Sequence, residues 1–271
     1  MGFWSFLSSV QGVFLSEQCH MCLQSSTKRC AATTALCERC FLSLPGLYSH
    51  RCSQCAEPAT QAQISGPNHA PFICATCQYW HPAFDSTFTC CDYAAPVDHW
   101  IAQLKYHNDS GTAKVLANLV AYAYRSKVSV AANQVSIELK MPIDFVIPAP
   151  ISRYRLISRG YNQAAIMAST IAQHTQSRLV LGLINKPIET AAQATLQADQ
   201  RADNLMNAFA VNRSHAQFAD IAGKHVAVVD DVMTTGATLE ALAHLLKTQC
   251  KVARVTNFVF ARTAPPATLA P

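Results

Sequence analysis

Along the last two thirds of the chain, segments with a helical pattern of hydrophobic residues alternate with short, continuous apolar runs. In some segments apolar residues recur about every 3.6 positions, which predicts helices, and in others a short apolar run ends at a polar residue or a proline, which predicts a buried strand. The expected elements are helices over 98–106, 111–127, 162–174 and 234–247, and strands over 143–149, 179–184, 225–229 and 252–260. Because strands alternate with helices, we expect an α/β fold with a mostly parallel sheet covered by helices on both faces.

The first third of the chain is organised differently, as a repeated pair of cysteines separated by two residues. The pairs are Cys19 and Cys22, Cys37 and Cys40, Cys52 and Cys55, and Cys74 and Cys77. Their near-regular spacing indicates an internal duplication of a small unit. The segments between them are too short and too polar to fold around a core of their own, so a metal ion would have to stabilise them. We expect a small module over residues 1–91 and a larger domain over residues 92–271.

Two cysteines with this spacing lie on one tight turn and can bind the same ion, and two such turns complete a closed tetrahedral zinc site. Eight cysteines therefore predict two structural Zn²⁺ sites. We favour sequential pairing, in which one site is the first cysteine group (Cys19, Cys22, Cys37 and Cys40) and the other is the second cysteine group (Cys52, Cys55, Cys74 and Cys77). Interleaved pairing of the turns fits the spacing too, and a redox dithiol or unrelated buried thiols are further alternatives. Closed sites leave no position for a substrate, so this module is expected to serve folding and partner contact.

Composition and charge narrow the class of protein. Of the 271 residues, 50% are hydrophobic, which is enough to bury a core. The formal charge of +5 lies wholly after residue 90, because four basic and four acidic residues precede that point and 17 basic and 12 acidic residues follow it. A basic excess of this size suits phosphates or nucleic acid as ligands, although ordinary surface charge gives the same number.

The start of the chain and the remaining cysteines bear on location. The first 18 residues lack a positively charged region and a cleavage site, so they predict no secretion signal, and no apolar stretch is long enough to predict a membrane span. We therefore expect a cytoplasmic protein, in which metal binding is favoured over disulfides. Residues 3–15 predict a short amphipathic helix. Free buried thiols are expected at Cys30, Cys90, Cys91 and Cys250.

The most specific pattern begins at residue 225, where an apolar strand is followed by two aspartates, a loop of threonine and glycine, and a helix. This arrangement predicts a phosphate-binding loop, because backbone N–H groups at the start of a helix point toward an anion and the helix dipole favours negative charge. The residues concerned are Asp230, Asp231, Thr234, Thr235, Gly236, Ala237 and Thr238. The carboxylates would accept hydrogen bonds from ribose hydroxyls or reach a Mg²⁺ ion through water. The alternative is a helix that is merely capped at Thr234.

This segment resembles the signature of the type I phosphoribosyltransferases. Further blocks accompany it, at Leu104–Tyr106, Ile147–Pro150, Arg159–Gln163, Gln193–Leu196, Arg201, Asn204 and Asn207–Phe209. Together with the cysteine pairs, this order resembles the ComF/GntX family over nearly the whole chain. The resemblance implies a double zinc-ribbon module on a type I phosphoribosyltransferase-like fold. It also implies a role in the uptake or use of external DNA during natural transformation.

The resemblance further implies a ligand and a set of site residues. The ligand is 5-phosphoribosyl diphosphate, or a ribose 5-phosphate group, together with Mg²⁺, and Asp230 and Asp231 would be the catalytic residues if the sugar is transferred. The candidate cations for the diphosphate are Arg159, Arg201 and Lys105, with Arg153 and Arg155 behind them. Family members often carry a second basic residue within the block Gln193–Phe209, and here Ala202 and Asp203 follow Arg201, which weakens the local charge.

Three functions compete at this point. An active transferase would release diphosphate from C1 of the ribose as a nitrogen nucleophile attacks, and a loop over residues 186–205 would close over the site. A sensor would bind the sugar phosphate without turnover. A nucleic-acid-binding module would hold single-stranded DNA through basic and aromatic side chains, and the expected partners are other DNA-uptake proteins. The aromatic candidates are Tyr79, Trp80, Trp100 and Tyr106, for each of which core packing is the alternative.

Overall fold

The computed structural model describes residues 18–25, 28–47, 49–60, 72–106, 110–131, 141–187 and 208–263. By packing, the chain forms two compact units, Met1–Ser43 and Leu44–Pro271. The smaller unit contains β1 Arg29–Cys30, β2 Thr33–Cys37 and α1 Glu38–Leu42. The larger unit contains, in chain order, α3 Ala75–Trp80, β3 Ser86–Asp92, α4 Val97–Tyr106, α5 Ser110–Ala131, β4 Phe145–Pro148, α7 Arg153–Arg159, α8 Gln163–Thr175, β5 Arg178–Leu179, β6 Ile184–Asn185, β7 Ala210–Val211, β8 His225–Met233, α10 Ala237–Gln249 and β9 Arg254–Arg262.

In the described part of the smaller unit, few apolar side chains other than those of cysteines are buried. Its strands β1 and β2 form an antiparallel hairpin, and α1 follows β2 directly. Leu36 on β2 and Phe41 on α1 are buried. A unit of this size buries too little apolar surface to be stable alone, so its cysteines are the natural source of further stability.

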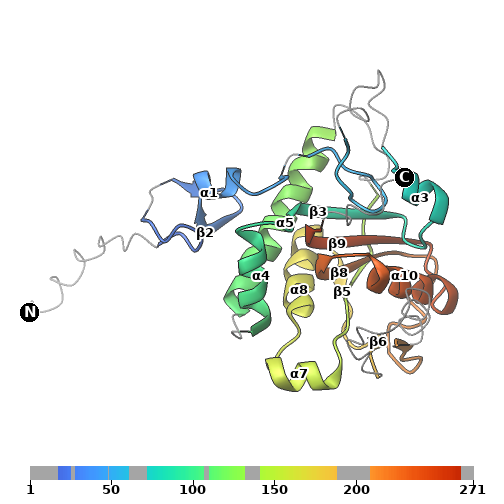
Figure 1. The fold of residues 1–271 in the computed structure, drawn as a ribbon. Helices are drawn as coiled ribbons and strands as arrows, with labels where there is room; N and C mark the ends of the chain where they lie inside the picture. Colours follow the sequence, from blue (N-terminus) through green and yellow to red (C-terminus); the bar gives the residue numbers. More distant parts are fainter. Residues whose placement is uncertain are drawn as a thin grey trace, which may run out of the picture. The chain divides into compact units, whose positions relative to one another are not determined.

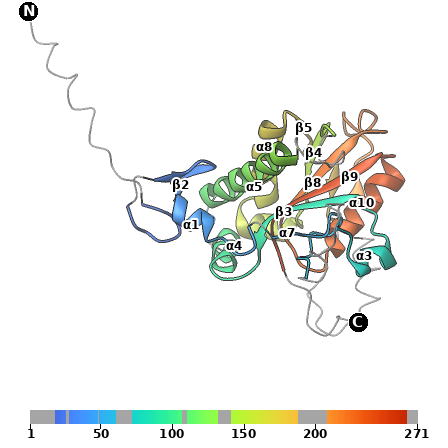
Figure 2. The same cartoon turned by 90° about the horizontal axis from the view of Figure 1, so that it is seen from above.

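The larger unit is built on a five-stranded sheet with the order β3-β9-β8-β4-β5. All neighbouring strands in this sheet pair in parallel. Helices α5 and α8 pack together on one face of the sheet, and α10 covers the other face (Figures 1 and 2). The structure therefore confirms the predicted α/β class, a parallel sheet flanked by helices.

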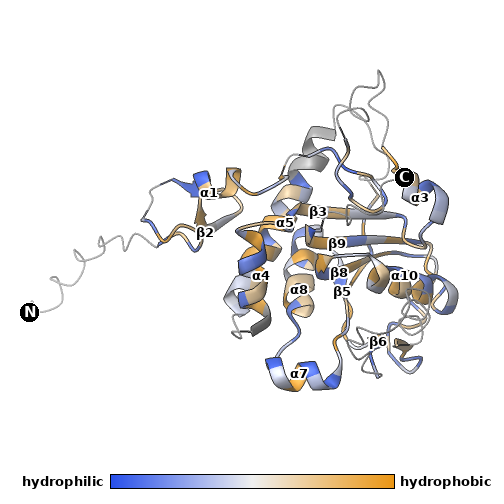
Figure 3. Cartoon of the chain, viewed as in Figure 1, coloured by the Kyte–Doolittle hydropathy of each residue, from blue (hydrophilic) through white to orange (hydrophobic). Residues whose placement is uncertain are grey.

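Burial explains the composition of these strands. All four residues of β4 are buried, and in β9 only Arg254, at its start, keeps partial exposure. Strands that are covered on both faces form continuous hydrophobic runs instead of alternating with polar residues. The central strands are accordingly coloured as mostly hydrophobic in Figure 3.

The connections of the sheet diverge between β4 and β8. From β4 the chain passes through α7 and α8 to β5 on one side, whereas from β8 it passes through α10 to β9 on the opposite side. In open α/β sheets, ligands bind at the carboxyl ends of the strands where connections diverge in this way. The carboxyl ends of β4 and β8 therefore define the edge at which a ligand site is expected.

Some element boundaries differ from those expected. The single strand predicted over 179–184 is instead the two short strands β5 and β6, because Gly182 between them has a φ of 77°, which no extended strand contains. Strand β8 continues to Met233, because Asp230 and Val232 still pair with β9. Helix α10 correspondingly begins at Ala237, three residues later than expected.

Strand β3 was not predicted and lies inside the segment expected to be a separate zinc module. It pairs in parallel with β9 along its length, and its five central residues are buried. The second cysteine group also belongs to the larger unit, because its four residues are buried in the same core cluster as Phe84 and Ile147. The smaller compact unit ends at Ser43, between the two cysteine groups.

Several expectations concern residues outside the described part of the chain. These are the helix over 3–15, the blocks Gln193–Leu196, Arg201 and Asn204, and most of the loop over 186–205. Among the helices that the structure does describe, none combines the length and the apolar character needed to cross a membrane.

Candidate functional site

The segment predicted to bind phosphate lies at the edge where the connections of β4 and β8 diverge. Asp230 and Asp231 are still part of β8, near its carboxyl end. Thr234 and Thr235 follow the strand and are exposed, and α10 begins two residues later. Two acids, two exposed hydroxyl groups and a helix N-terminus therefore meet at one edge of the sheet.

The two aspartates have different surroundings. Asp231 is 5% exposed, and its carboxylate accepts hydrogen bonds from the Gln163 side chain at 3.3 Å and from the Val232 N–H at 2.8 Å. Asp230 is half-buried, and its carboxylate accepts from the N–H of Asp231 at 2.8 Å. Asp231 is thus anchored to α8, while Asp230 keeps more of its surface open to a ligand.

Gly236 turns the chain from the loop into α10. It has φ 85° and ψ −4°, a left-handed conformation, and stands at the N-cap without a side-chain cap. The hydroxyl oxygen of Thr235 accepts a hydrogen bond from the Ala237 N–H at 3.3 Å. The alternative of a helix capped at Thr234 is therefore wrong. The N-cap residue itself offers no side chain to the N–H groups that follow Ala237, and free N–H groups at the start of a helix can bind an anion.

Replacing Gly236 with alanine is expected to destabilise the protein and distort the loop. The left-handed conformation costs a non-glycine residue about 1–2 kcal/mol. A Cβ would also lie 2.6 Å from the terminal methyl group of Met233, which is itself buried. The matched control is Gly223→Ala, which has a φ of 71° but nothing within 4 Å of the added Cβ. Thermal unfolding should show the larger loss of stability for Gly236→Ala, and equal losses would contradict a tight fit at the loop.

Hydrogen bonds bring other sequence blocks to the same edge. Asn162 caps α8, and its amide group donates to the carbonyl of Ala149, just beyond β4, at 3.0 Å. The hydroxyl of Tyr161 donates to the carbonyl of Leu104 on α4 at 2.7 Å. With the bond from α8 to Asp231, these contacts join four segments that are separate in the sequence.

The structure describes the three candidate cations to different extents. Arg159 is the last residue of α7, is half-buried, and is followed by Gly160 in a left-handed conformation. Lys105 lies in α4, and its side chain is outside the described part of the chain, as is Arg201 altogether. Of these three, Arg159 alone has a described side chain, on the helix that follows β4 at the ligand edge.

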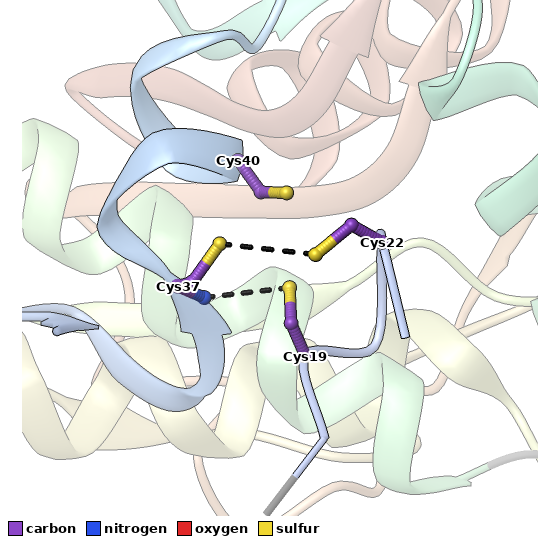
Figure 4. Close-up of side chains that lie close together, drawn as sticks. All are labelled: Cys19, Cys22, Cys37 and Cys40. Carbon is purple, nitrogen blue, oxygen red and sulfur yellow. Dashed lines mark hydrogen bonds between the residues drawn. The ribbon is translucent and has the colours of Figure 1, made fainter. Parts of the chain in front are cut away.

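The four sulfur atoms of the first cysteine group converge on one point (Figure 4). All of them lie within 4.8 Å of one another. The sulfur atoms of Cys22 and Cys37 are 4.0 Å apart, and the N–H of Cys37 donates to the sulfur of Cys19 at 3.4 Å. Such convergence is what a single tetrahedral ion requires.

The second cysteine group repeats this geometry. Its sulfur atoms also lie within 4.8 Å of one another, and the N–H of Cys74 donates to the sulfur of Cys52 at 3.3 Å. In both groups the third cysteine is the N-cap of a short helix, α1 or α3, that carries the fourth. The cysteines are therefore grouped sequentially and not interleaved, and the shared geometry agrees with an internal duplication.

The protonation of these thiols indicates that they fit a divalent cation. Hydrogen bonds from Cys55 and Cys77 lower the pKa of Cys52, whereas the bond with Cys52 raises the pKa of Cys55 to about 12. Burial opposes ionisation of Cys19, but N–H groups of the backbone lower its pKa to about 6. The Cys52 thiolate thus suppresses ionisation of the Cys55 thiol beside it. A bound cation removes this repulsion, and four thiolates are a ligand set that zinc prefers.

The remaining thiols and aromatic candidates are placed as follows. Cys30, Cys90, Cys91 and Cys250 are buried, as expected, and none of them forms a disulfide with another described residue. Trp100 is buried in the core, whereas Tyr79 and Trp80 on α3 are 78% and 72% exposed. The side chain of Tyr106 lies outside the described part of the chain.

Arg262, the last residue of β9, is a site residue that the sequence reasoning missed. It is 6% exposed, and its guanidinium group donates to the carbonyl of Met233 at 3.1 Å, directly before the loop. A signal was present in the sequence, because a charged residue directly follows the apolar run Phe258–Ala261. What such a residue contacts cannot be read from that pattern.

The parallel sheet, the divergent connections and the acidic loop define the class of this protein, which has a phosphoribosyltransferase-type α/β domain. The family model described as phosphoribosyl transferase domain matches residues 160–265. Among solved structures, the chain is similar to adenine phosphoribosyltransferase from Saccharomyces cerevisiae, with 18% identity, 55% of this chain and 68% of that chain covered, and a TM-score of 0.32.

Relatives identify the family more closely. The DNA utilization protein YhgH of Escherichia coli O6:H1 is 31% identical over 195 residues, which are 72% of this chain and 77% of that protein. Competence protein F of Haemophilus influenzae is 30% identical over 64% of this chain and 72% of that protein. Competence protein ComFC of Bacillus subtilis is 22% identical over 84% of each chain. The chain belongs to the ComF family.

Proposed function

We propose that this ComF-family protein binds 5-phosphoribosyl diphosphate with Mg²⁺ at the loop Asp230–Thr238 and acts in the uptake or use of external DNA. The observation that carries the ligand is the position of Asp230, Asp231 and the start of α10 at the edge where β4 and β8 diverge. The biological role rests on the relatives, which are named as competence and DNA utilization proteins.

Each part of this edge has a distinct task in the proposal. The 5-phosphate lies against the N–H groups of the loop and the first turn of α10, where the helix dipole favours negative charge. Asp230 accepts hydrogen bonds from the ribose hydroxyls, and Asp231 holds the strand end in place through α8. Arg159 is the described candidate cation, and it lies three residues before Asn162, the N-cap of α8. We propose that it faces the diphosphate. Mg²⁺ neutralises charge on the diphosphate when it is bound.

A transferase reaction would use this geometry in a simple way. The bond from C1 of the ribose to the diphosphate oxygen breaks, diphosphate leaves with the bonding electrons, and a nitrogen nucleophile forms the new bond at C1 and loses a proton to solvent. The developing positive charge at the sugar is stabilised by the carboxylates of Asp230 and Asp231. Release of diphosphate in the presence of a panel of nitrogen bases separates an active transferase from a protein that binds the sugar without turnover.

Calorimetric titration of 5-phosphoribosyl diphosphate with Mg²⁺ into the full-length protein tests the ligand. We expect saturable binding, weaker binding of ribose 5-phosphate because it lacks the diphosphate, and weaker binding again of inorganic diphosphate because it lacks the sugar. Equal affinity for all three would indicate a non-specific anion site. Absence of heat and of any thermal stabilisation with the full ligand would remove this ligand from the proposal.

Single-stranded DNA is a second candidate ligand, favoured by the exposed aromatic pair on α3. The rings of Tyr79 and Trp80 lie 5.4 Å apart in a T-shaped contact, and both remain largely open to solvent. Exposed aromatic rings beside basic residues can stack with unpaired bases. Binding of oligonucleotides that falls steeply with salt and is lost in Tyr79→Ser/Trp80→Ser would support this role, whereas unchanged binding in that variant would exclude α3 as the contact.

The two cysteine groups are proposed to hold two structural Zn²⁺ ions. Four convergent thiols in each group leave no open ligand position, so these ions would contribute stability and take no part in a reaction. Metal analysis of the purified protein should give two zinc ions per chain.

A further inference from the structure

Arg262 is a buried cation to which the proposed sugar-phosphate binding assigns no task. Its hydrogen-bond acceptors within the described chain are carbonyl and hydroxyl oxygens of neighbouring segments rather than carboxylates. Burying a guanidinium group is costly unless several hydrogen bonds hold it. The buried guanidinium group of Arg262 therefore fixes the positions of particular backbone segments.

The guanidinium group joins two segments that are far apart in the sequence. Its Nε donates to the carbonyl of Cys55, in the turn of the second cysteine group, at 3.1 Å. Its Nη1 donates to the carbonyls of Met233, at 3.1 Å, and of Thr234, at the start of the proposed phosphate loop. The rigid fork of an arginine can hold two such groups at a fixed separation, which a single ammonium group cannot do.

These bonds also determine where the loop N–H groups point. In a planar trans peptide, the carbonyl and the N–H of the next residue point in opposite directions. Arg262 holds the carbonyl of Thr234, whereas the carbonyl of Met233 is held by Arg262 together with the Thr263 N–H, which donates to it at 3.0 Å. Because both carbonyls point toward the end of β9, the N–H groups of Thr234 and Thr235 point away from it. Thr234 and Thr235 are exposed, so that side of the loop is open to an anion.

The second cysteine group provides a firm support for this fork. Cys55 lies in a tight turn in which the Ala56 N–H donates to the carbonyl of Cys52 at 2.9 Å, and Ala56 has a φ of 59°. The group is buried in the core cluster of the larger unit. A zinc ion with four thiolates carries a net charge of −2, which would favour a cation bound to this turn.

We propose that Arg262 is a positioning residue that braces the phosphate loop against the turn of the second cysteine group and so orients the loop N–H groups toward the sugar phosphate. This inference rests on the proposed function for its ligand, but the ordering of the loop does not depend on any ligand. It gives the second cysteine group a task in the ligand site that a purely structural zinc site would not have.

The test compares Arg262→Met and Arg262→Lys with the control Arg254→Met in the full-length, zinc-loaded protein. Arg254 begins the same strand, at the end opposite to the loop. Backbone ¹⁵N relaxation of the ligand-free protein measures order at Thr234–Gly236. We expect order parameters typical of rigid backbone, about 0.85, in the wild type and in the control, and values below about 0.6 in both variants of Arg262. Lysine keeps the charge but not the fork, so it should not restore order.

Two further readouts complete the test. Calorimetry with 5-phosphoribosyl diphosphate and Mg²⁺ should show affinity about tenfold weaker in both Arg262 variants and unchanged in the control. Transfer of zinc to a colorimetric chelator should be faster in the Arg262 variants, because the Cys55 turn loses its contact.

The outcomes separate this proposal from the proposed function. Unchanged loop order in Arg262→Met overturns the positioning role, and full order in Arg262→Lys shows that charge suffices and overturns the role of the fork. Reduced order with unchanged ligand affinity also overturns it, because the loop N–H groups would then not depend on Arg262. If the wild type binds no 5-phosphoribosyl diphosphate, the ligand is wrong, and the relaxation measurements still decide whether Arg262 orders the loop.

Discussion

Replacing Asp230 or Asp231 with asparagine should weaken binding of 5-phosphoribosyl diphosphate and Mg²⁺ by about 10- to 100-fold each, because each change removes the negative charge from a hydrogen bond worth roughly 1.5–3 kcal/mol. Asparagine keeps the size of the side chain, so the strand end should stay folded. At Asp231 the amide oxygen can still accept from the Val232 N–H, and the amide NH₂ can donate to the oxygen of the Gln163 side chain once that amide turns over. The double variant should show no measurable binding by calorimetry.

The chain offers a matched control for these variants. Asp144 lies at the amino end of β4, where its carboxylate accepts from the His225 N–H at 2.9 Å, at the edge opposite to the proposed site. Asp144→Asn should therefore bind the ligand as the wild type does, even if its thermal stability falls. Equal binding in all three single variants would show that the acids do not contact the ligand, and equal weakening would show a general loss of structure.

Loss of the second cysteine group should destabilise the larger unit much more than loss of the first. Changing Cys74 and Cys77 to serine removes two ligands from the second cysteine group, whose residues are buried in the core cluster around Phe84 and Ile147. We expect the free energy of unfolding of the larger unit to fall by about 5 kcal/mol or more, and its Tm to fall by more than about 10 °C.

Changing Cys37 and Cys40 to serine is the matched variant in the first cysteine group. This group belongs to the compact unit that ends at Ser43 and contains the hairpin and α1. We expect that unit to unfold while the main thermal transition of the larger unit moves by less than about 3 °C.

Circular dichroism, calorimetric unfolding and zinc analysis measure both effects. Each double variant should retain one zinc ion, and sugar-phosphate binding should survive only in Cys37→Ser/Cys40→Ser. Similar falls in the main transition for the two variants would mean that both groups support the sheet. No fall for either would mean that the thiols contribute no metal-dependent stability.

Local spacing predicted the chemistry of this protein well. A cysteine pair separated by two residues lies on one turn whatever surrounds it, so the eight candidate ligands followed from the sequence. The sequence favoured sequential grouping but left interleaved grouping open, and the structure decided for the sequential one. The conformation of an apolar run followed by two acids and a loop with Gly236 is likewise determined by residues close together in the sequence. The parallel sheet followed from the alternation of strands with helices.

Pairing over long distances was less visible in the sequence. Strand β3 contains threonines and cysteines, which are neither clearly polar nor strongly hydrophobic in a pattern, and only its parallel pairing with β9 identifies it as part of the sheet. The break at Gly182 was missed because a glycine within an apolar run does not show whether its φ is positive.

The sequence by itself thus determined the class of fold, the cysteine pairs and the acidic loop, since each is read from patterns among residues close together in the chain. The tertiary structure alone decided that the second cysteine group is packed into the sheet unit and that Arg262 joins its turn to the loop. Both depend on contacts between segments more than one hundred and fifty residues apart, such as the bond from Arg262 to Cys55 at a separation of 207 residues. Which segments meet at such distances is set by the order of strands in the sheet, and no local pattern of residues carries that order.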